Sequence, residues 1–224
     1  MPAPSKPLVV AIDGPSASGK GTLARRLAEA YRLAHLDTGR IYRATGLAVL
    51  VAGGDPADPA AAEKAARNLD FATLADPRLR REDVGRASSL VAAIPAVRAA
   101  LLEAQRTFAH HPPRLAGGPA RGAVLDGRDI GTVVCPDADV KIFLVASAES
   151  RAMRRVKELR ESGAPAIYEA VLQDMRERDA RDSERRVAPL AAAPDANIID
   201  TTLLDADQVF EQASDLIARH CARP

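Results

Sequence analysis

The stretch Gly14-Pro15-Ser16-Ala17-Ser18-Gly19-Lys20-Gly21-Thr22 determines the fold of this chain. The continuous apolar run Leu8–Ile12 precedes it and has the pattern of a buried strand in a parallel sheet. Residues 21–31 follow it with apolar side chains at helical spacing. Glycines in such a turn let backbone N–H groups converge on a phosphate, and the helix N-terminus adds its dipole. The order strand, glycine-rich turn, helix therefore predicts a phosphate-binding loop in which Lys20 reaches the terminal phosphates.

The stretch departs at one position from the pattern G-x-x-x-x-G-K-[ST]. Gly21 follows Lys20, and the hydroxyl group is displaced to Thr22, a form typical of nucleoside monophosphate kinases. We therefore expect Thr22 to touch a phosphate or a metal ion, through water. The alternative is a tight glycine turn without a ligand, and a lysine placed between a strand and a helix argues against it.

Composition limits the classes of function. The 224 residues carry 31 Lys and Arg against 30 Asp and Glu, so bulk charge does not favour binding to nucleic acid or a membrane surface. No run approaches the roughly 18 apolar residues of a membrane span. The Pro-rich residues 1–7 lack the apolar core of a signal peptide, and we expect a disordered tail there. The distant Cys135 and Cys221 fit a reducing, cytoplasmic location, with Cys135 as a small buried apolar residue.

Strands and helices alternate along the chain. Apolar runs predict further strands at 35–37, 123–125, 140–146 and 197–200, and helical spacing predicts helices at 41–51, 97–108, 148–161, 167–185 and 205–219. This order predicts an α/β fold with a central parallel sheet covered on both faces, in three layers. Ligands bind such sheets at the carboxyl ends of the strands, which is where Asp13, Asp37 and Asp126 fall.

Several further blocks make the chain similar to bacterial cytidylate kinases. They are Leu36-Asp-Thr-Gly-Arg-Ile-Tyr-Arg43, the segment 91–98, Asp126-Gly-Arg-Asp-Ile-Gly-Thr-Val-Val134 and the segment 177–185. The resemblance runs from Val10 to Thr202. It implies a P-loop kinase fold and transfer of the γ-phosphoryl group of ATP to CMP or dCMP, giving ADP and CDP or dCDP in pyrimidine nucleotide metabolism. It also implies Mg²⁺ as cofactor, a monomer, and no nucleic-acid or membrane partner.

The resemblance also implies which residues form the site. Those expected to bind ATP are Gly14, Pro15, Ser16, Ala17, Ser18, Gly19, Lys20, Gly21 and Thr22. Those expected to bind CMP are Thr38, Tyr42, Arg43, Ser89, Arg98, Arg128, Asp129, Arg178, Asp182 and Arg185. Lys20, Arg128, Arg178 and Arg185 are the expected catalytic residues, and Arg181 and Arg186 stay undecided.

The residue types suit the proposed chemistry. Asp129 could accept from the exocyclic amine of cytosine and Arg98 could donate to its ring, whereas uracil presents an acceptor where cytosine presents a donor. Arg43 and Arg128 would hold the acceptor phosphate, and Arg178, Asp182 and Arg185 would meet the ribose and phosphate from the lid. The alternative for 177–186 is a solvated helix in which neighbouring charges pair with each other.

No general base is needed, because a nucleoside monophosphate has a second pKa of about 6 and its oxygen is already a nucleophile. His35, His110, His111 and His220 are therefore expected to be solvated residues on loops or termini. Direct metal ligation is not expected. Asp126 and Thr22 could hold the water shell of Mg²⁺, Asp13 could share that task, and Asp126 could instead form a turn or helix cap.

The expected domain organisation is a single P-loop kinase domain over 8–224, with its core at 8–55, 96–147 and 187–224. A shortened nucleoside-binding insert is expected at about 56–95, without strand alternation between Phe71 and Ser88. A helical lid is expected at about 148–186, hinged near Ser162-Gly163, with a fixed helical hairpin as the alternative. Other readings are a kinase for adenylate, uridylate or a metabolite such as shikimate, a P-loop switch, and a nucleic-acid module.

Overall fold

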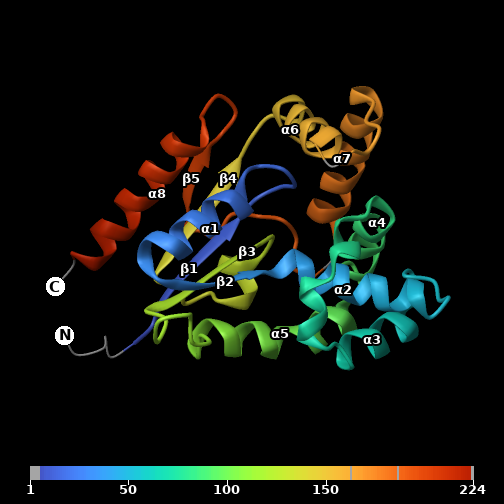
Figure 1. Ribbon diagram of the computed structural model, residues 1–224, viewed down its shortest axis with the longest axis horizontal. Helices are drawn as coiled ribbons and strands as arrows, with labels where there is room; N and C mark the ends of the chain where they lie inside the picture. The colour runs from blue at the N-terminus through green and yellow to red at the C-terminus, as the bar shows by residue number, and fades with distance from the viewer. Residues whose placement is uncertain (1–5, 162, 186, 223–224) are drawn as a thin grey trace.

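The computed structural model describes residues 6–161, 163–185 and 187–222 (Figure 1). A five-stranded sheet lies at its centre, with strand order β2-β3-β1-β4-β5. The strands are β1 (Leu8–Asp13), β2 (Leu33–Asp37), β3 (Gly122–Gly127), β4 (Val140–Val145) and β5 (Asn197–Asp200). All neighbouring strands pair in parallel. The predicted α/β fold with a central parallel sheet is confirmed.

Alternate residues of β1 face opposite sides of the sheet, as the period of a strand requires. Val9 and Ala11 belong to one buried cluster, which contains apolar side chains of α5 (Pro95–His110). Val10 and Ile12 belong to a second cluster, with α1 (Lys20–Tyr31) and α8 (Ala206–Cys221). The two clusters give the predicted three layers, and they fix the strand ends against which the site is built. Cys135 is fully buried in the first cluster, as predicted.

The region at 56–95, all of it described, contains no strand, in agreement with the prediction. It folds instead as α3 (Pro59–Arg67), η1 (Phe71–Ala75), η2 (Pro77–Arg80) and α4 (Glu82–Val91), of which η1 and η2 are short 3₁₀ turns. The side chains of Asp58, Asp70 and Asp76 accept backbone N–H groups at the starts of α3, η1 and η2. The sequence pattern missed α3 and α4 because their buried positions are largely alanine and serine, which give a weak apolar signal.

The helix α2 (Thr38–Val51) packs against α3 and α4. It begins at Thr38, ahead of the predicted start at Ile41, because the carboxylate of Asp37 accepts the N–H of Arg40 and caps the helix. One short element was not predicted at all, the π-helical turn η3 (Ile130–Val134) directly after β3.

The two predicted charged helices form a pair above the sheet, α6 (Ala148–Glu161) and α7 (Tyr168–Glu184) (Figure 1). They share a small apolar core of their own, made of Ala152, Val156, Leu159, Val171 and Met175. Gly163 lies between them with a φ of +78°. Ser162 and Arg186 lie outside the described residues, as do positions 1–5 of the predicted tail. Lys6 is described, and it pairs with Asp139 at 3.2 Å.

We searched the described residues for helices that could cross a membrane. No single helix there combines the necessary length and apolar character, and only α4 and α5 pass the test together, as a pair bent by 98°.

Candidate active site

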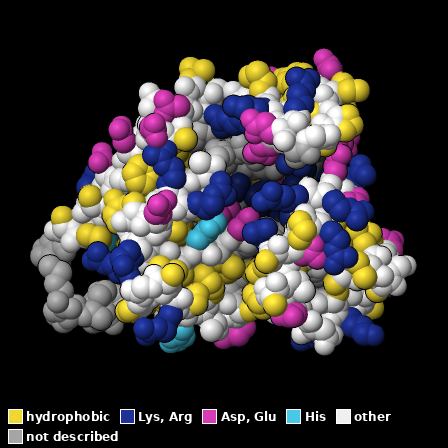
Figure 2. Space-filling view, viewed as in Figure 1, with side chains coloured by type: hydrophobic (Ala, Val, Ile, Leu, Met, Phe, Trp, Pro, Cys, Tyr) yellow, Lys and Arg dark blue, Asp and Glu magenta, His cyan; other side chains and the backbone are white. Residues whose placement is uncertain are grey.

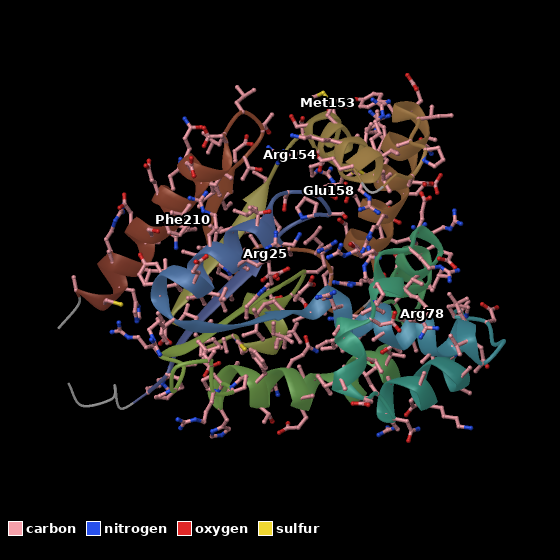
Figure 3. The ribbon with its side chains drawn as sticks, viewed as in Figure 1. Arg25, Arg78, Met153, Arg154, Glu158 and Phe210 are labelled. Atoms are coloured by element: carbon pink, nitrogen blue, oxygen red, sulfur yellow. The ribbon has the colours of Figure 1, made fainter. Side chains whose placement is uncertain are left out.

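A cleft of about 390 Å³ lies at the carboxyl ends of the central strands, where the sequence predicts ligand binding. The loop after β1, α1 and the ends of β2 and β3 form its floor, and α2, α4, α6 and α7 form its walls. Lys and Arg side chains gather around the hollow between the α6–α7 pair and the rest of the molecule (Figure 2). Figure 3 shows Glu158 of α6 above Arg25 of α1, and both line the cleft.

The phosphate-binding loop has the backbone geometry that its sequence predicts. Gly14 has a φ of +143°, and a Cβ there would lie 2.3 Å from the carbonyl oxygen of Leu144, so that only glycine fits beside β4. Gly19 has a φ of +98° and stands at the N-cap of α1, where no side chain caps the helix. Thr22 and Leu23 donate their N–H groups to the carbonyl of Gly19. Among the described residues, the N–H groups of Lys20 and Gly21 are thus left for a ligand, at a position that lines the cleft.

Lys20 is held inside this loop. Its Nζ donates to the carbonyl of Pro15 at 2.6 Å and lies 3.5 Å from the hydroxyl of Ser18. Burial and the nearby charge of Arg128 lower the pKa of Lys20 well below its usual value. An anion in the loop would compensate that charge. Thr22 lines the cleft as well, and its hydroxyl accepts from Arg25 at 3.3 Å.

Two carboxylates, those of Asp37 and Asp126, line the cleft at the ends of β2 and β3 and pair in register across the sheet. Burial, followed by the charge of Asp126, raises the pKa of Asp37. Carboxylate and hydroxyl oxygens are the donors that Mg²⁺ prefers, and it usually keeps several of its waters. Asp37, Asp126 and Thr22 therefore fit a hydrated Mg²⁺ at the floor of the cleft.

Asp13 has a different task from the one considered for it. Its two carboxylate oxygens accept the N–H groups of Ile130 and Gly131 at 2.8 and 2.7 Å, which fixes the segment that follows Arg128 and Asp129. Burial raises the pKa of Asp13 to about 6, against the effect of these two hydrogen bonds. Asp13 is thus occupied in orienting the backbone after β3.

The prediction that His35 is a solvated loop residue is wrong. The strand β2 begins at Leu33, so that His35 lies within it, and its side chain is only 20% exposed. Its Nε2 lies 2.7 Å from a carboxylate oxygen of Asp126. His110 and His111 stand at the end of α5, and His220 lies in the last turn of α8.

Arginines from three elements meet at the opposite wall. Arg43 of α2, Arg128 after β3 and Arg178 of α7 all line the cleft. Arg128 donates through its Nε to Asp182 at 2.8 Å, and Arg185 lies 3.9 Å from the same carboxylate. The positive charges of Arg128 and Arg178 outweigh burial and lower the pKa of Asp182. The solvated-helix alternative is wrong for Asp182 and Arg185, whose side chains are buried, although these two residues do lie 3.9 Å apart as it expects. Arg178 is partly buried.

Two guanidinium nitrogens of this wall have no partner. Within the described part of the chain, Arg178 Nε and Arg185 Nη2 are buried and donate to no hydrogen-bond acceptor. Burial, and then the charge of Arg128, lowers the pKa of Arg178 to about 9. Buried donors without acceptors are costly, so this arrangement favours an anion between the arginines and the phosphate-binding loop.

The residues expected to read the base lie together behind this wall. Asp129 forms a buried ion pair with Arg98, whose guanidinium lies 5.4 Å from the centre of the Tyr42 ring. Thr38 is buried, and its hydroxyl donates to the carbonyl of Asp126 at 2.7 Å. The structure thus brings Arg98 and Asp129 into direct contact, whereas Thr38 fixes the end of β3. These residues are buried and are not among those that line the cleft.

Ser89 lines the cleft from α4 and accepts a hydrogen bond from Arg181 Nε at 3.2 Å. This bond joins α4 to α7 and gives Arg181, undecided from the sequence, a definite partner.

Sequence reasoning missed several residues on the lid side. Arg155 lines the cleft and is one of the charges that act on Arg43 and Arg178. One turn earlier, the buried Arg151 pairs with Asp179 at 2.7 Å and donates to the carbonyl of Ser16 at 3.3 Å. Arg151 thereby connects α6 and α7 to the phosphate-binding loop. The spacing of Arg151 and Arg155 on one helix face was the available signal, but the partners of Arg151 are too distant in sequence to be found from it.

Comparison with known proteins agrees with this geometry. The chain matches the cytidylate kinase family over residues 10–219. It is 59% identical to the cytidylate kinase of Rhodospirillum rubrum over 211 aligned residues, and the aligned region covers 94% of this chain and 97% of that protein. It is 59% identical over 209 residues to the cytidylate kinase of Paramagnetospirillum magneticum, with 93% and 97% covered. A solved structure of an uncharacterised protein from Eubacterium ventriosum, 16% identical, has a similar fold, with a TM-score of 0.52 over 97% of this chain and 100% of that one. The chain belongs to the cytidylate kinase family.

Proposed function

We propose that the phosphates of donor and acceptor meet in the cleft between the phosphate-binding loop and the arginine wall. The chain is an ATP-dependent nucleoside monophosphate kinase, and it transfers the γ-phosphoryl group of ATP to CMP or dCMP. The observation that carries the assignment of the site is the buried Nε of Arg178, which has no acceptor among the described residues and belongs to a residue that lines the same cleft as the glycine loop. Such a donor in a phosphotransferase calls for a phosphate oxygen.

The donor side is the loop Gly14–Thr22. Its backbone N–H groups and the N-terminus of α1 bind the β- and γ-phosphates of ATP. Lys20 exchanges the carbonyl of Pro15 for the terminal phosphate oxygens, and the phosphate restores the charged form of its amine.

The acceptor side is the arginine wall. Arg43, Arg128, Arg178 and Arg185 hold the phosphate of CMP, and Asp182 keeps Arg128 in place. An oxygen of this phosphate attacks the γ-phosphorus in line, the bond to the β–γ bridging oxygen breaks, and ADP leaves. Since the acceptor is already a dianion, catalysis consists of alignment and charge neutralisation, in which Lys20, Arg128, Arg178 and Arg185 take part.

The base is read by the Arg98–Asp129 pair, with Tyr42, Ser89 and Thr38 around it. The carboxylate of Asp129 accepts from the exocyclic amine of cytosine while it remains paired with Arg98. Uracil places a carbonyl oxygen against the same carboxylate, so that UMP is the poorer substrate.

A divalent metal accompanies ATP in this family, and we assign it as Mg²⁺. When bound, it neutralises charge on the β- and γ-phosphates. Asp126 and Thr22, which line the cleft together with Asp37, would hold its waters. His35 and the backbone partners of Asp13 keep this edge of the sheet in order.

We further propose that 56–95 is the nucleoside-binding insert and 148–186 the lid, which closes over both nucleotides and keeps water from the γ-phosphate. The enzyme would act as a monomer on small molecules. Its use of ATP supports the predicted cytoplasmic location.

The test is a coupled assay of ADP release with CMP, dCMP, UMP and AMP as acceptors. We expect turnover with CMP or dCMP to exceed that with UMP and AMP by at least about tenfold, because a buried polar group left without its partner costs about 1–3 kcal/mol. Equal turnover with AMP would contradict the assignment of Arg98 and Asp129.

A further inference from the structure

Arg43 lies on α2, but its guanidinium is held by the insert. Its Nη1 donates to the carbonyl of Leu79 at 2.8 Å and lies 3.5 Å from the carbonyl of Arg81. These acceptors are main-chain atoms of η2 and of the residue that follows it. Because a backbone carbonyl is present whatever the side chain, the sequence at these positions does not indicate the contact.

The carbonyl of Leu79 is itself fixed. The side chain of Leu79 is 1% exposed and packs with Ala44, Leu47 and Val84 from the helices on either side. The turn begins at Pro77, where the carboxylate of Asp76 accepts the N–H of Arg78 at 2.8 Å. Figure 3 labels Arg78 on this turn. A buried leucine and a capped turn therefore give the carbonyl one position, which the guanidinium must follow.

The other surface against the guanidinium is Gly85 of α4. A Cβ at this glycine would lie 3.2 Å from Nη1, 3.4 Å from Nη2 and 3.6 Å from Cζ of Arg43. Its φ is not in the left-handed region, so the helix has no need of glycine here and alanine would favour the helix. The lack of a side chain thus gives room to Arg43, and Gly85 lines the cleft beside it.

We propose that η2 and Gly85 together position Arg43 for the phosphate of the acceptor. The two carbonyls take Nη1, and this directs the Nε–H and Nη2–H donors of the planar fork toward the cleft. The shortened insert would then recognise the phosphate through Arg43 as well as the base. This inference rests on the proposed role of Arg43 and assigns Gly85 and Leu79 as positioning residues.

The test is Gly85→Ala. The added methyl group displaces a guanidinium at the end of a flexible side chain, and we expect the KM for CMP to rise about tenfold, with kcat and the KM for ATP changed by less than about twofold. The melting temperature should not fall, because alanine is the better helix former. The inhibition constant of cytidine, which has no phosphate, should stay the same. Arg80→Ala is the matched control, since Arg80 lies on the same turn with its side chain exposed, and it should leave all these values unchanged.

A double-mutant cycle completes the test. In an Arg43→Ala background, Gly85→Ala should cause no further rise in the KM for CMP, because its effect acts through Arg43. The proposal is overturned if Gly85→Ala leaves the KM for CMP unchanged, weakens cytidine equally, or adds its full effect in the absence of Arg43. A wild-type enzyme that fails to phosphorylate CMP would contradict the proposed function instead, and the two failures are therefore distinguishable.

Discussion

The two sides of the cleft are built in different ways. The donor side is one continuous loop, and its ligand-binding groups are backbone N–H groups held by glycines and by the start of α1. The acceptor side is made of side chains that come from α2, α4, α7 and the segment after β3. Its arginines are placed by carboxylates and carbonyls far away in the sequence, such as Asp182 for Arg128 and Leu79 for Arg43.

The two sides also differ in how the basic side chains are hydrogen-bonded before the substrates bind. On the donor side the amine of Lys20 donates to a carbonyl of its own loop. On the acceptor side Arg178 and Arg185 keep buried donors without acceptors among the described residues. The free protein therefore carries an unbalanced positive region at the acceptor wall, which a phosphate dianion would stabilise.

The largest effect is expected for Lys20→Ala, which removes the cation held within the phosphate-binding loop. Turnover should fall by about 10³-fold or more, because the charge that develops on the transferred phosphoryl group loses its partner. The fold should persist, since the variant removes a buried cation. Steady-state kinetics and a melting curve check this, with the affinity for CMP as the control. Turnover near that of the wild type would remove the donor side from the comparison.

The next effect is expected for Arg178→Ala on the acceptor side. We expect kcat/KM for CMP to fall by about 10²–10³-fold, while the KM for ATP changes little. Without substrates, the melting temperature should be equal or higher, because a buried and unpaired donor is lost. Inorganic phosphate or CMP should raise the melting temperature of the wild type more than that of the variant. A variant that is strongly destabilised without substrate would show that Arg178 supports the fold.

A moderate effect concerns stability and pH at Asp13, which connects the two sides. Its pKa is raised from 3.8 to about 6 in the folded protein, so the native state binds its proton more tightly than the unfolded chain. The contribution of Asp13 to the free energy of unfolding should thus be greatest below about pH 4 and decline as pH rises through about pH 6. Denaturant unfolding of the wild type and of Asp13→Asn across this range measures the difference. If the free energy of unfolding of the wild type, relative to that of Asp13→Asn, increased with rising pH, the assignment would be contradicted.

The smallest effect is expected for Ser89→Ala, which removes the acceptor of Arg181 between insert and lid. We expect the KM for CMP to rise about two- to threefold, the effect of one partly exposed hydrogen bond. Hydrogen exchange of α7 should become faster. Ser88→Ala is the matched control, since the hydroxyl of Ser88 donates to Gly85 within the same helix and does not touch the lid. Equal changes in both variants would mean that α4 is merely loosened.

The same contrast between the two sides explains what could be predicted from the sequence. The phosphate-binding loop and the strand ends at Asp13, Asp37 and Asp126 follow from local pattern, because a strand, a turn and a helix are encoded within a few neighbouring residues. The resemblance to the family supplied Arg98, Asp129, Arg178 and Asp182, and the structure brings these into two buried groups. Their roles toward a ligand remain predictions.

Other features depend on contacts between distant segments and were missed for that reason. His35 was taken for a solvated residue at the start of a predicted strand, because a short run of residues does not show that β2 already begins at Leu33. The bond from Arg43 to the carbonyl of Leu79 leaves no trace in side-chain pattern. Asp13 was a candidate for the metal site, and only the parallel register of β1 and β3 shows why its carboxylate reaches Ile130 and Gly131 instead.

The central claim is that donor and acceptor phosphates meet in one cleft. The most direct test is calorimetry with a bisubstrate analogue in which adenosine and cytidine are joined by a chain of phosphates. We predict that one molecule binds per chain, at least about 10²-fold more tightly than ATP or CMP alone, because one ligand then engages both sides at once. We also predict that Lys20→Ala and Arg178→Ala each abolish most of this gain. An analogue that binds no more tightly than ATP, or that leaves room for CMP to bind beside it, would contradict the claim.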